Sequence, residues 1–576
     1  MPLAVAILYA ANKLALAPAL LHTMTIITIL TWILGGALTL GLGFIVKEWL
    51  WNPLMLIELC KRQGIKGFPF VPFVGQMPAI DEVLSGRNRR VQKQDNDEVE
   101  DEDRLTAVTN CYRNHGSTFY FTVGRTVRLS IADPPLIKDI LIANSESYSK
   151  PLHIRKLGVL GDGIFASSGS TWSPQRSLFT GAFHTKEVKS KIPTMIDCAH
   201  SAVEKWSREL NDGYSELDMY QKFAELTLDV IGKTAFGTEE IGGASEAASV
   251  IGSFNRYLLY CRELVFGPPA TFPTSLRYVQ RKHLVSRGIA AEAKWLRTYM
   301  GRIISARRNS HHSGAAETVS DRHDLLDVII GAVDNIGHSE EGAKKALNEA
   351  PDQTISEKRK RAAEMTRLTE KQLLDNALTV LLAGHETTAS LLTWTIYLLA
   401  KHPLWQKRAR AEVEEFCPGG VVEPQVLSHL KLLGMILLES LRLFPPVPLI
   451  GRMCIKDNKV GPDLLIPEGL EIVIPVAVLH RDRTIWGDNA DEFAPARFGN
   501  GISGACGNPL AFLPFGAGPR TCIGQTLALS EAKAVLAVML PLFSWKLSTS
   551  YRHSPDVTLT MMPEFGMPVV LEKIEK

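Results

Sequence analysis

The first hydrophobic feature of the chain is a long apolar run near its N-terminus. No Asp, Glu, Lys or Arg occurs from Leu14 to Val46, and His22 is the only titratable residue among these 33. A hydrocarbon core of ~30 Å needs only ~20 apolar helical residues, so the run is longer than one straight span requires. Its most uniform part, residues 24–46, is followed by KEWLW at 47–51, a Lys and two Trp residues typical of a membrane–water boundary. We therefore predict a transmembrane anchor over residues 24–51.

The residues on either side of this anchor bear on its orientation. The basic segment KRQGIK follows at 61–66, and the positive-inside tendency then predicts that the bulk of the chain is cytosolic. A cleaved signal peptide is the alternative, but the run is too long and lacks a basic region before it. Residues 1–23 are an apolar extension interrupted by Lys13 and Pro18. They are either a second, interfacial segment or an extension upstream of a start at Met24.

Loop-forming and charged residues separate the anchor from the body of the chain, over residues 52–105. The segment GIKGFPFVPFVG at 64–75 is rich in Gly and Pro, which disfavour a helix, so we predict a rigid proline-rich elbow. Residues 86–104 are almost wholly polar and mostly charged, which is typical of a solvated surface segment. We predict that both parts form a linker.

The remaining residues, 106–576, combine long helical patterns with short apolar runs such as residues 471–478, which are typical of strands. There is no βαβ alternation and no glycine-rich dinucleotide fingerprint. Polar stretches near 309–323 and 338–362 predict loops between helices. We predict a mainly α (α+β) fold: one large helix-rich domain with a small β region. The long helical patterns cover residues 186–211, 216–236, 281–308, 369–401 and 526–541.

The composition then narrows the classes of function. The net charge is +2, from 63 basic and 61 acidic residues, whereas a nucleic-acid-binding protein carries a basic domain or stripe. With 45% hydrophobic residues, the chain can bury a large core. Its eight cysteines are scattered, with no CxxC pair and no zinc-type spacing. We expect most of them to be reduced packing residues rather than parts of a disulfide scaffold.

One cysteine requires a different explanation: Cys522, in the segment FGAGPRTCIG at Phe515–Gly524. Glycines and a proline predict a tight loop, and an apolar helix follows the cysteine at once. A thiol at a helix N-terminus and near Arg520 experiences a positive potential, which favours the thiolate. A thiolate facing a flat apolar cofactor is what a five-coordinate heme iron needs, and sulfur ligation favours O–O cleavage. A buried structural cysteine is the alternative, which the whole ten-residue spacing disfavours.

This loop resembles that of the cytochrome P450 superfamily. The family pattern Phe-x-x-Gly-x-Arg-x-Cys-x-Gly is matched in full, and the resemblance extends over about 500 residues from the elbow to the C-terminus. Three further motifs occur in the family's order. The resemblance implies that Cys522 is the axial ligand of the heme iron. It also assigns heme binding to the other pattern residues, Phe515, Gly518, Arg520 and Gly524.

The second motif is AGHETT at Ala383–Thr388, inside an otherwise apolar helical stretch. Burying Glu386 and Thr387 is unfavourable unless these side chains are paired or used. A hydrogen bond from the Thr387 hydroxyl to the preceding helical turn is the alternative. Gly384 should leave room for a ligand beside the backbone. The motif is similar to the family's oxygen-binding helix, which implies proton delivery to bound dioxygen by Glu386 and Thr387 and places Ala383 over the heme.

The third motif is Glu439-Ser-Leu-Arg442, about 80 residues before Cys522, with Arg497 further on. Glu and Arg at i, i+3 share a helix face, and an ordinary surface pair of ~0.3 kcal/mol is the alternative interpretation. By position, the three residues resemble the family's Glu–Arg–Arg core. The resemblance implies a structural role, in which they support the loop that presents the cysteine.

The fourth motif is Trp172-x-x-x-Arg176, whose members share one face of a helix and could both bind an anionic propionate. A Trp–Arg stack on the surface is equally compatible with this spacing. The motif matches the position of the family's propionate-binding helix, and Arg452 and Arg520 match further propionate contacts. Val447 and Leu449, together with Ala383, are the positions at which we expect the substrate pocket.

The resemblance implies a reaction as well as a site. The cofactor would be heme b, and the co-substrates O2 and NADPH-derived electrons delivered by a separate flavoprotein reductase. The substrate would be a small hydrophobic molecule: a terpenoid, steroid, plant-hormone-like molecule or fatty acid. The C-terminal half looks closest to plant microsomal members, which implies a single-pass protein of the endoplasmic reticulum membrane with a cytosolic catalytic domain and no nucleic-acid partner. Two alternatives are a heme-thiolate isomerase or dehydratase of hydroperoxides and a non-catalytic heme-binding membrane protein.

Overall fold

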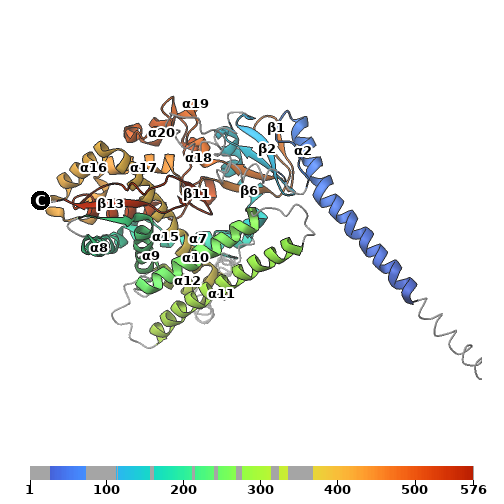
Figure 1. Cartoon of the computed structure of the whole chain (residues 1–576), viewed down its shortest axis with the longest axis horizontal. Coiled ribbons are helices and arrows are strands. Elements are labelled where there is room, and N and C mark those ends of the chain that lie inside the picture. Colours follow the sequence, from blue (N-terminus) through green and yellow to red (C-terminus); the bar gives the residue numbers. More distant parts are fainter. Residues whose placement is uncertain are drawn as a thin grey trace, which may run out of the picture.

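One long helix, Ile26–Arg62, projects from the rest of the molecule (Figure 1). The helix has 37 residues and contains an 18-residue window with a mean hydropathy of 2.1. No part of this window is buried against the rest of the protein. By length and composition, the helix could therefore cross a membrane. A π-helical turn, η1 (Lys47–Trp51), leads directly into α2 (Asn52–Arg62), which packs on the domain through Ile57 and Cys60. The helix therefore continues 11 residues into the segment predicted as linker.

The computed structural model describes residues 26–72, 75, 112, 115–155, 161–210, 214–238, 244–266, 276–312, 324–334 and 368–574. The apolar extension 1–23, the charged segment 86–104 and the polar stretch 338–362 lie outside the described residues.

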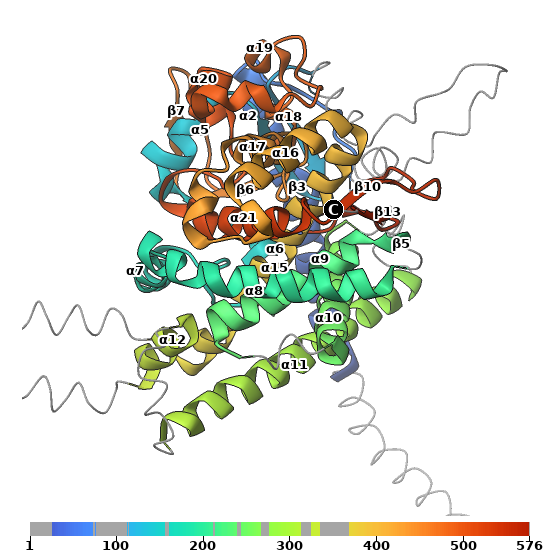
Figure 2. The same cartoon turned by 90° about the vertical axis from the view of Figure 1, so that its left-hand side faces the viewer.

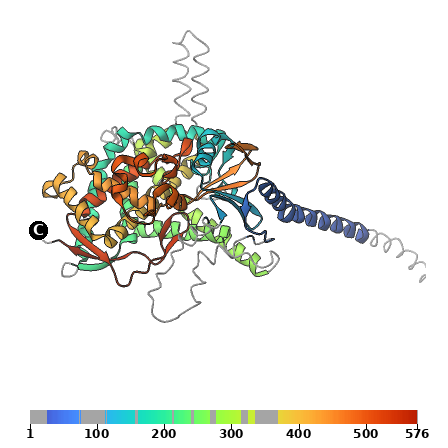
Figure 3. The same ribbon diagram turned by 90° about the horizontal axis from the view of Figure 1, so that it is seen from above.

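The β region lies at the end of the domain where the N-terminal helix leaves it (Figure 3). Its main sheet has six strands in the order β1-β2-β3-β9-β6-β4, and α2 contacts β3. The prediction of a strand over 471–478 is only half right. Pro475 has no N–H for a strand ladder, and the chain turns there into the short helix α18 (Val476–Leu479). The strands are β1 (Lys66–Gly67), β2 (Thr118–Val123), β3 (Thr126–Ile131), β4 (Tyr148–Ser149), β6 (Ile450–Cys454) and β9 (Glu471–Ile474).

Helices form most of the domain, around the central helix α15 (Glu370–Lys401). A capping box between Thr369 and Gln372 starts this helix, and buried residues occur all around its circumference, as in a helix enclosed by others. It contacts α9, α11, α17 and α21, and Figure 2 shows α21 lying between α17 and α8. The larger helices are α7 (Trp172–Ala182), α8 (Thr185–Glu209), α9 (Met219–Phe236), α10 (Ala244–Phe266), α11 (Leu276–His312), α12 (Leu325–Asp334), α16 (Pro403–Phe416), α17 (Lys431–Leu443) and α21 (Gln525–Met539).

Smaller elements complete the domain and position parts of the site. The strands β10 (Phe543–Leu547), β13 (Pro568–Lys573) and β5 (Tyr214–Asp218) form a three-stranded sheet, and β11 (Pro555–Val557) pairs with β12 (Met561–Pro563) as a hairpin. The mainly helical fold with a small β region is confirmed. The remaining short elements are α5 (Pro134–Lys138), α6 (Leu152–Arg155), β7 (Asn458–Val460), β8 (Leu464–Ile466), α19 (Arg483–Trp486) and α20 (Gly501–Cys506).

Candidate functional site

The loop 515–524 closes on itself and ends one residue before α21. The backbone N–H of Cys522 donates to the carbonyl of Phe515 at 2.8 Å, and the Thr521 hydroxyl donates to the carbonyl of Gly518 at 2.7 Å. Gly518 has φ +73°, and a Cβ there would lie 2.0 Å from the carbonyl oxygen of Leu141. Only glycine tolerates both this conformation and this close approach. The loop thereby fixes the cysteine at the N-terminal end of α21.

Cys522 differs from every other cysteine in the described part of the chain, because its side chain is accessible while the other six are buried. Burial by surrounding protein nonetheless raises the pKa of its thiol, opposed by a hydrogen bond from the backbone of Gly524 and by the charge of Arg176. A thiol that is both deep in the protein and accessible borders an interior space. Such a thiol can bind a metal ion from that space, and ligation deprotonates it.

Four cationic side chains gather beside this loop: Lys150, Arg176, Arg452 and Arg520. Burial lowers the pKa of all four, to about 10 for Arg452 and Arg520, and the proximity of Arg520 lowers the pKa of Lys150 and Arg452 further. Among the described residues, no carboxylate forms an ion pair with any of them, although unpaired buried charges are costly. An anionic ligand would offset this cost, and the two propionates of a heme fit the cluster.

The Trp172 and Arg176 motif contributes to this cluster, with a partner that the sequence did not indicate. The guanidinium of Arg520 lies 4.4 Å from the Trp172 ring centroid, so the Trp–Arg stack forms with Arg520 rather than Arg176. Arg520 also donates to the carbonyl of Ser167 at 2.8 Å. The position of Lys150 in this cluster could not be predicted, because a lone Lys before a Pro carries no signal of burial.

On α15, the motif residues point in different directions. Ala383 is exposed and Thr387 is half-buried, whereas Glu386 is only 4% exposed. The Thr387 hydroxyl donates to the carbonyl of Ala383 at 2.7 Å, which is the backbone hydrogen bond weighed above as the alternative. The expectation for Gly384 is wrong: a Cβ there would lie 2.6 Å from Ile231 of α9, so this glycine permits helix–helix packing rather than ligand access.

The carboxyl group of Glu386 lies in the protein interior. Its Oε1 accepts a hydrogen bond from the Thr560 hydroxyl at 2.7 Å, and its Oε2 has no hydrogen-bond partner among the described residues. Burial raises the pKa of this carboxyl to about 7, although the Thr560 hydrogen bond lowers it. At neutral pH the group can therefore both bind and release a proton.

A second buried carboxylate, Glu439 on α17, is fully paired. Arg442 donates to its Oε2 at 2.7 Å and to its Oε1 at 2.8 Å, and the guanidinium of Arg497 lies 3.5 Å from Oε1. The backbone N–H of Ala494 also donates to Oε1. The structure thus brings together the three residues of the third motif, in the core rather than on the surface.

His480 connects this core to the cysteine loop. Leu513 N–H donates to its Nε2 at 2.8 Å, so Nδ1 carries the proton and donates to the carbonyl of Arg442 at 3.2 Å. Burial and the charge of Arg442 lower the pKa of His480 to about 3, which keeps the ring neutral. This role of His480 could not be predicted, because it depends on contacts across 33 and 38 residues.

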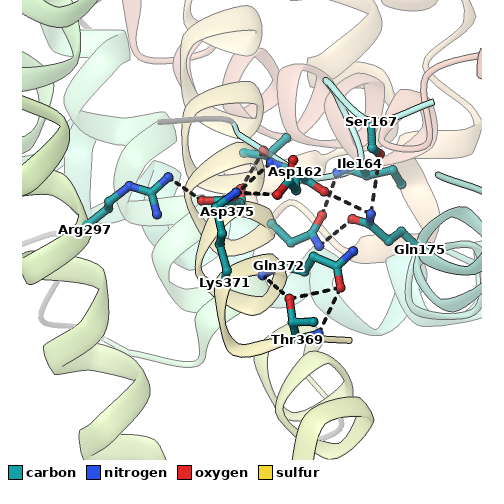
Figure 4. Close-up of polar contacts among 11 residues, drawn as sticks. Asp162, Ile164, Ser167, Gln175, Arg297, Thr369, Lys371, Gln372 and Asp375 are labelled. Atoms are coloured by element: carbon teal, nitrogen blue, oxygen red, sulfur yellow. Dashed lines mark hydrogen bonds and ion pairs between the residues drawn. The ribbon is translucent and has the colours of Figure 1, made fainter. Parts of the chain in front are cut away.

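A polar cluster attaches the loop 161–168 to the start of α15 (Figure 4). Asp375 accepts from the backbone N–H of Asp162 at 2.9 Å and from Arg297 at 2.5 Å, and Asn376 accepts from the N–H of Ile164 at 2.8 Å. Asn376 also donates to Gln175 of α7 at 2.7 Å. The cluster therefore fixes α7, which carries Trp172 and Arg176, relative to α15.

Comparisons with known proteins agree with this geometry. The family model described as Cytochrome P450 matches residues 97–569. The chain is 32% identical to "Cytochrome P450 734A1" of Arabidopsis thaliana, over 91% of this chain and 93% of that one. It is also 32% identical to "Secologanin synthase 2" of Catharanthus roseus, over 94% and 96% of the two chains.

These matches, together with the cysteine loop, define a heme-thiolate monooxygenase. The chain belongs to the cytochrome P450 family, which binds heme and uses O2 with electrons supplied by a redox partner. Its N-terminal apolar helix is consistent with membrane anchoring.

Proposed function

We propose that this protein is a membrane-anchored monooxygenase that holds heme b through Cys522 and hydroxylates a small hydrophobic substrate. Bound heme with a thiolate ligand activates O2, and the overall reaction is RH + O2 + NADPH + H⁺ → ROH + H2O + NADP⁺, with a separate flavoprotein reductase passing on the electrons. The observation that carries the proposal is the accessible, deep Cys522 beside four wholly or partly buried cations that lack carboxylate partners among the described residues.

The chain's own residues divide the remaining tasks. Arg176, Arg452, Arg520 and the Trp172 indole would bind the propionates, and Phe515, Gly518 and Gly524 shape the loop around the thiolate. Glu439, Arg442 and Arg497 hold the segment that supports this loop. The Thr387 hydroxyl and the Glu386 carboxyl of α15 would hold and move the protons that dioxygen reduction consumes.

The substrate pocket would include Ala383, Val447 and Leu449. Ala383 is exposed, and Val447 and Leu449 are 37% and 47% exposed although all three are apolar. Apolar side chains that line a pocket favour an apolar ligand. We infer a terpenoid, steroid, plant-hormone-like molecule or fatty acid, in keeping with a relative named for secologanin synthesis.

The decisive test uses the full chain in microsomes with a plant NADPH-dependent reductase. We expect a red-shifted ferrous–CO band in the wild type and NADPH-dependent product that contains one atom from labelled O2. Cys522→His should lose this band while keeping some heme, and Cys506→Ser, which changes another cysteine, should retain it. A band that survives in Cys522→His would refute the assignment of the ligand.

The same experiment distinguishes two alternatives. Product from a hydroperoxide without O2 or reductase would indicate an isomerase or dehydratase, and heme binding without turnover of any substrate class would indicate a non-catalytic protein. A spectral binding screen against gibberellins, brassinosteroids, cytokinins, triterpenes and fatty acids would identify the substrate class.

We also propose residence in the endoplasmic reticulum membrane with a cytosolic catalytic domain. Deletion of residues 1–51 should release the protein only partly from microsomes, because apolar residues of α2 such as Leu54 and Met55 remain exposed. Protease added outside sealed microsomes should cut within 86–104. Complete protection of that segment would contradict the proposed topology.

A further inference from the structure

One face of α15 is docked on the turn of the β11–β12 hairpin. Glu386, Ser390 and Trp394 are spaced by four residues, so they form a stripe along this face. Ser390 and Trp394 both donate to the carbonyl of Met561, at 2.5 and 3.0 Å, and Glu386 accepts from Thr560 at 2.7 Å. Three residues, one on each of three successive turns of α15, therefore hold the hairpin turn.

The same turn also contacts the segment that leads into the proposed substrate pocket. The backbone N–H of Met561 donates to the carbonyl of Pro446 at 2.8 Å, and Val447 is the next residue. Thr560 is only 2% exposed, and its hydroxyl is directed at Glu386 rather than at solvent. The position of the carboxyl thus depends on a residue 174 positions away in the sequence.

The surroundings of Glu386 contain few groups that could balance its charge. Burial, and to a smaller extent the charges of Glu386 and Asp218, raise the pKa of Tyr220 of α9, whose phenol donates to the sulfur of Met562 at 3.4 Å. Asp218 caps α9 through the N–H of Tyr220. Asp556, in the hairpin itself, is paired with Arg262 of α10. Among the described residues, Thr560 is the hydrogen-bond donor to the carboxyl.

We propose that Thr560 is a positioning residue for proton delivery: its hydroxyl holds the Glu386 carboxyl so that the group can alternate between its two protonation states. The inference rests on the monooxygenase function proposed above. In this role the carboxyl gives up its proton to the proton-delivery chain proposed above, the resulting carboxylate keeps the Thr560 hydrogen bond, and a proton taken up from solvent restores the acid. A hydrogen bond donated to the charged form favours that form, as the lowering of the Glu386 pKa by Thr560 indicates.

The test compares Thr560→Val, which removes the hydroxyl, with Thr560→Ser, which keeps it. Thr558→Val is the matched control, because Thr558 lies in the same turn and the hydrogen bond to Glu386 comes from Thr560. In full-length, heme-loaded protein, infrared difference spectra against Glu386→Gln identify the carboxyl band and give its titration midpoint. Product formed per NADPH is measured over the same pH range.

We expect the wild type to titrate near pH 7 and Thr560→Val about one pH unit higher, a roughly tenfold lower ratio of ionised to protonated carboxyl at a given pH. The pH dependence of product per NADPH should move by the same amount. Thr560→Ser and Thr558→Val should titrate as the wild type does. The ferrous–CO band verifies that each variant is folded and loaded, and if Thr560→Val does not load, Thr560→Ala takes its place.

Equal midpoints in the wild type and the hydroxyl-free variant would overturn the inference, as would an equal shift in Thr558→Val. Failure of the proposed function is recognised separately. A wild type that forms no NADPH-dependent product from any substrate class refutes the monooxygenase, whatever the infrared midpoints are. A coupled wild type with unmoved midpoints refutes only the role of Thr560.

Discussion

Two buried carboxylates, Glu439 of α17 and Glu386 of α15, differ in how completely their oxygens are hydrogen-bonded. Glu439 is inaccessible, and both its oxygens accept hydrogen bonds from Arg442. Glu386 is almost as buried, yet one of its oxygens has a single donor and the other has none among the described residues. The first carboxylate has its hydrogen-bonding capacity filled by arginine and backbone donors, whereas burial raises the pKa of the second to about 7.

This difference indicates different roles for the two residues: Glu439 supports the structure, and Glu386 can take part in proton transfer. A buried ion pair with complete hydrogen bonding fixes one geometry, because removing either partner leaves an uncompensated charge. A carboxyl with few partners has a raised pKa and can exchange protons at neutral pH. Glu439 therefore suits a structural role, whereas Glu386 suits a role in proton transfer.

The largest effect should come from Glu439→Gln. The change leaves the buried guanidinium groups of Arg442 and Arg497 without their anion, at a cost of about 3–5 kcal/mol in the free energy of unfolding. We expect little heme-loaded protein and a lower unfolding midpoint in denaturant. Glu572→Gln is the control, because Glu572 pairs with the exposed Lys546 and should cost under about 1 kcal/mol. Equal losses in the free energy of unfolding of the two variants would mean that the buried Glu439 stabilises the fold no more than an exposed ion pair does.

The helices and the cysteine loop are the parts that the sequence predicts well, because their signals are local. The helical pattern 369–401 corresponds to α15 within one residue, since its apolar positions and the Thr369 cap lie in one stretch of chain. The strand at 471–478 fails where Pro475 ends the ladder. The orientation of Glu386 and the burial of Lys150 could not be predicted, because each depends on residues far away in the sequence.

The next effect concerns Thr387→Ala. This side chain is half-buried and bonds the helix backbone, so its loss should leave folding, heme binding and substrate affinity nearly unchanged. Without the hydroxyl, we expect roughly 10²-fold slower product formation and electrons diverted from NADPH to hydrogen peroxide. Measurements of product and peroxide per NADPH check this, with Thr387→Ser as the control that keeps the hydroxyl. Unchanged coupling in Thr387→Ala would place proton delivery elsewhere.

A smaller effect, with a defined pH dependence, is expected for Glu386→Gln. Because the pKa of this carboxyl is raised from 4.5 to about 7 in the folded protein, its contribution to stability is present at low pH and is lost as pH rises between these values. The variant should match the wild type at pH 4.5 and exceed its free energy of unfolding by about 3 kcal/mol at pH 7, with no further gain above that. Product per NADPH should fall roughly tenfold and lose its pH dependence. A constant difference in stability from pH 4.5 to 8 would show that Glu386 does not titrate in this range.

The smallest effect on turnover should come from Glu531→Gln. This variant tests whether a buried carboxyl with an unpaired oxygen is enough to give a role in turnover. Glu531 of α21 is 1% exposed, its Oε1 has no partner among the described residues, and burial raises its pKa well above 4.5. Burial raises the pKa of the Cys198 thiol of α8, and Glu531 adds to that effect, so the Glu531 carboxyl lies near α8. Because Glu531 is on α21 rather than on α15, Glu531→Gln should leave product per NADPH unchanged. Because burial raises the pKa of Glu531, the free energy of unfolding of Glu531→Gln should increasingly exceed that of the wild type as pH rises above 4.5. If Glu531→Gln uncouples turnover, then incomplete hydrogen bonding does not by itself distinguish the two carboxyls, and the special role of Glu386 would have to rest on its neighbour Thr387 alone.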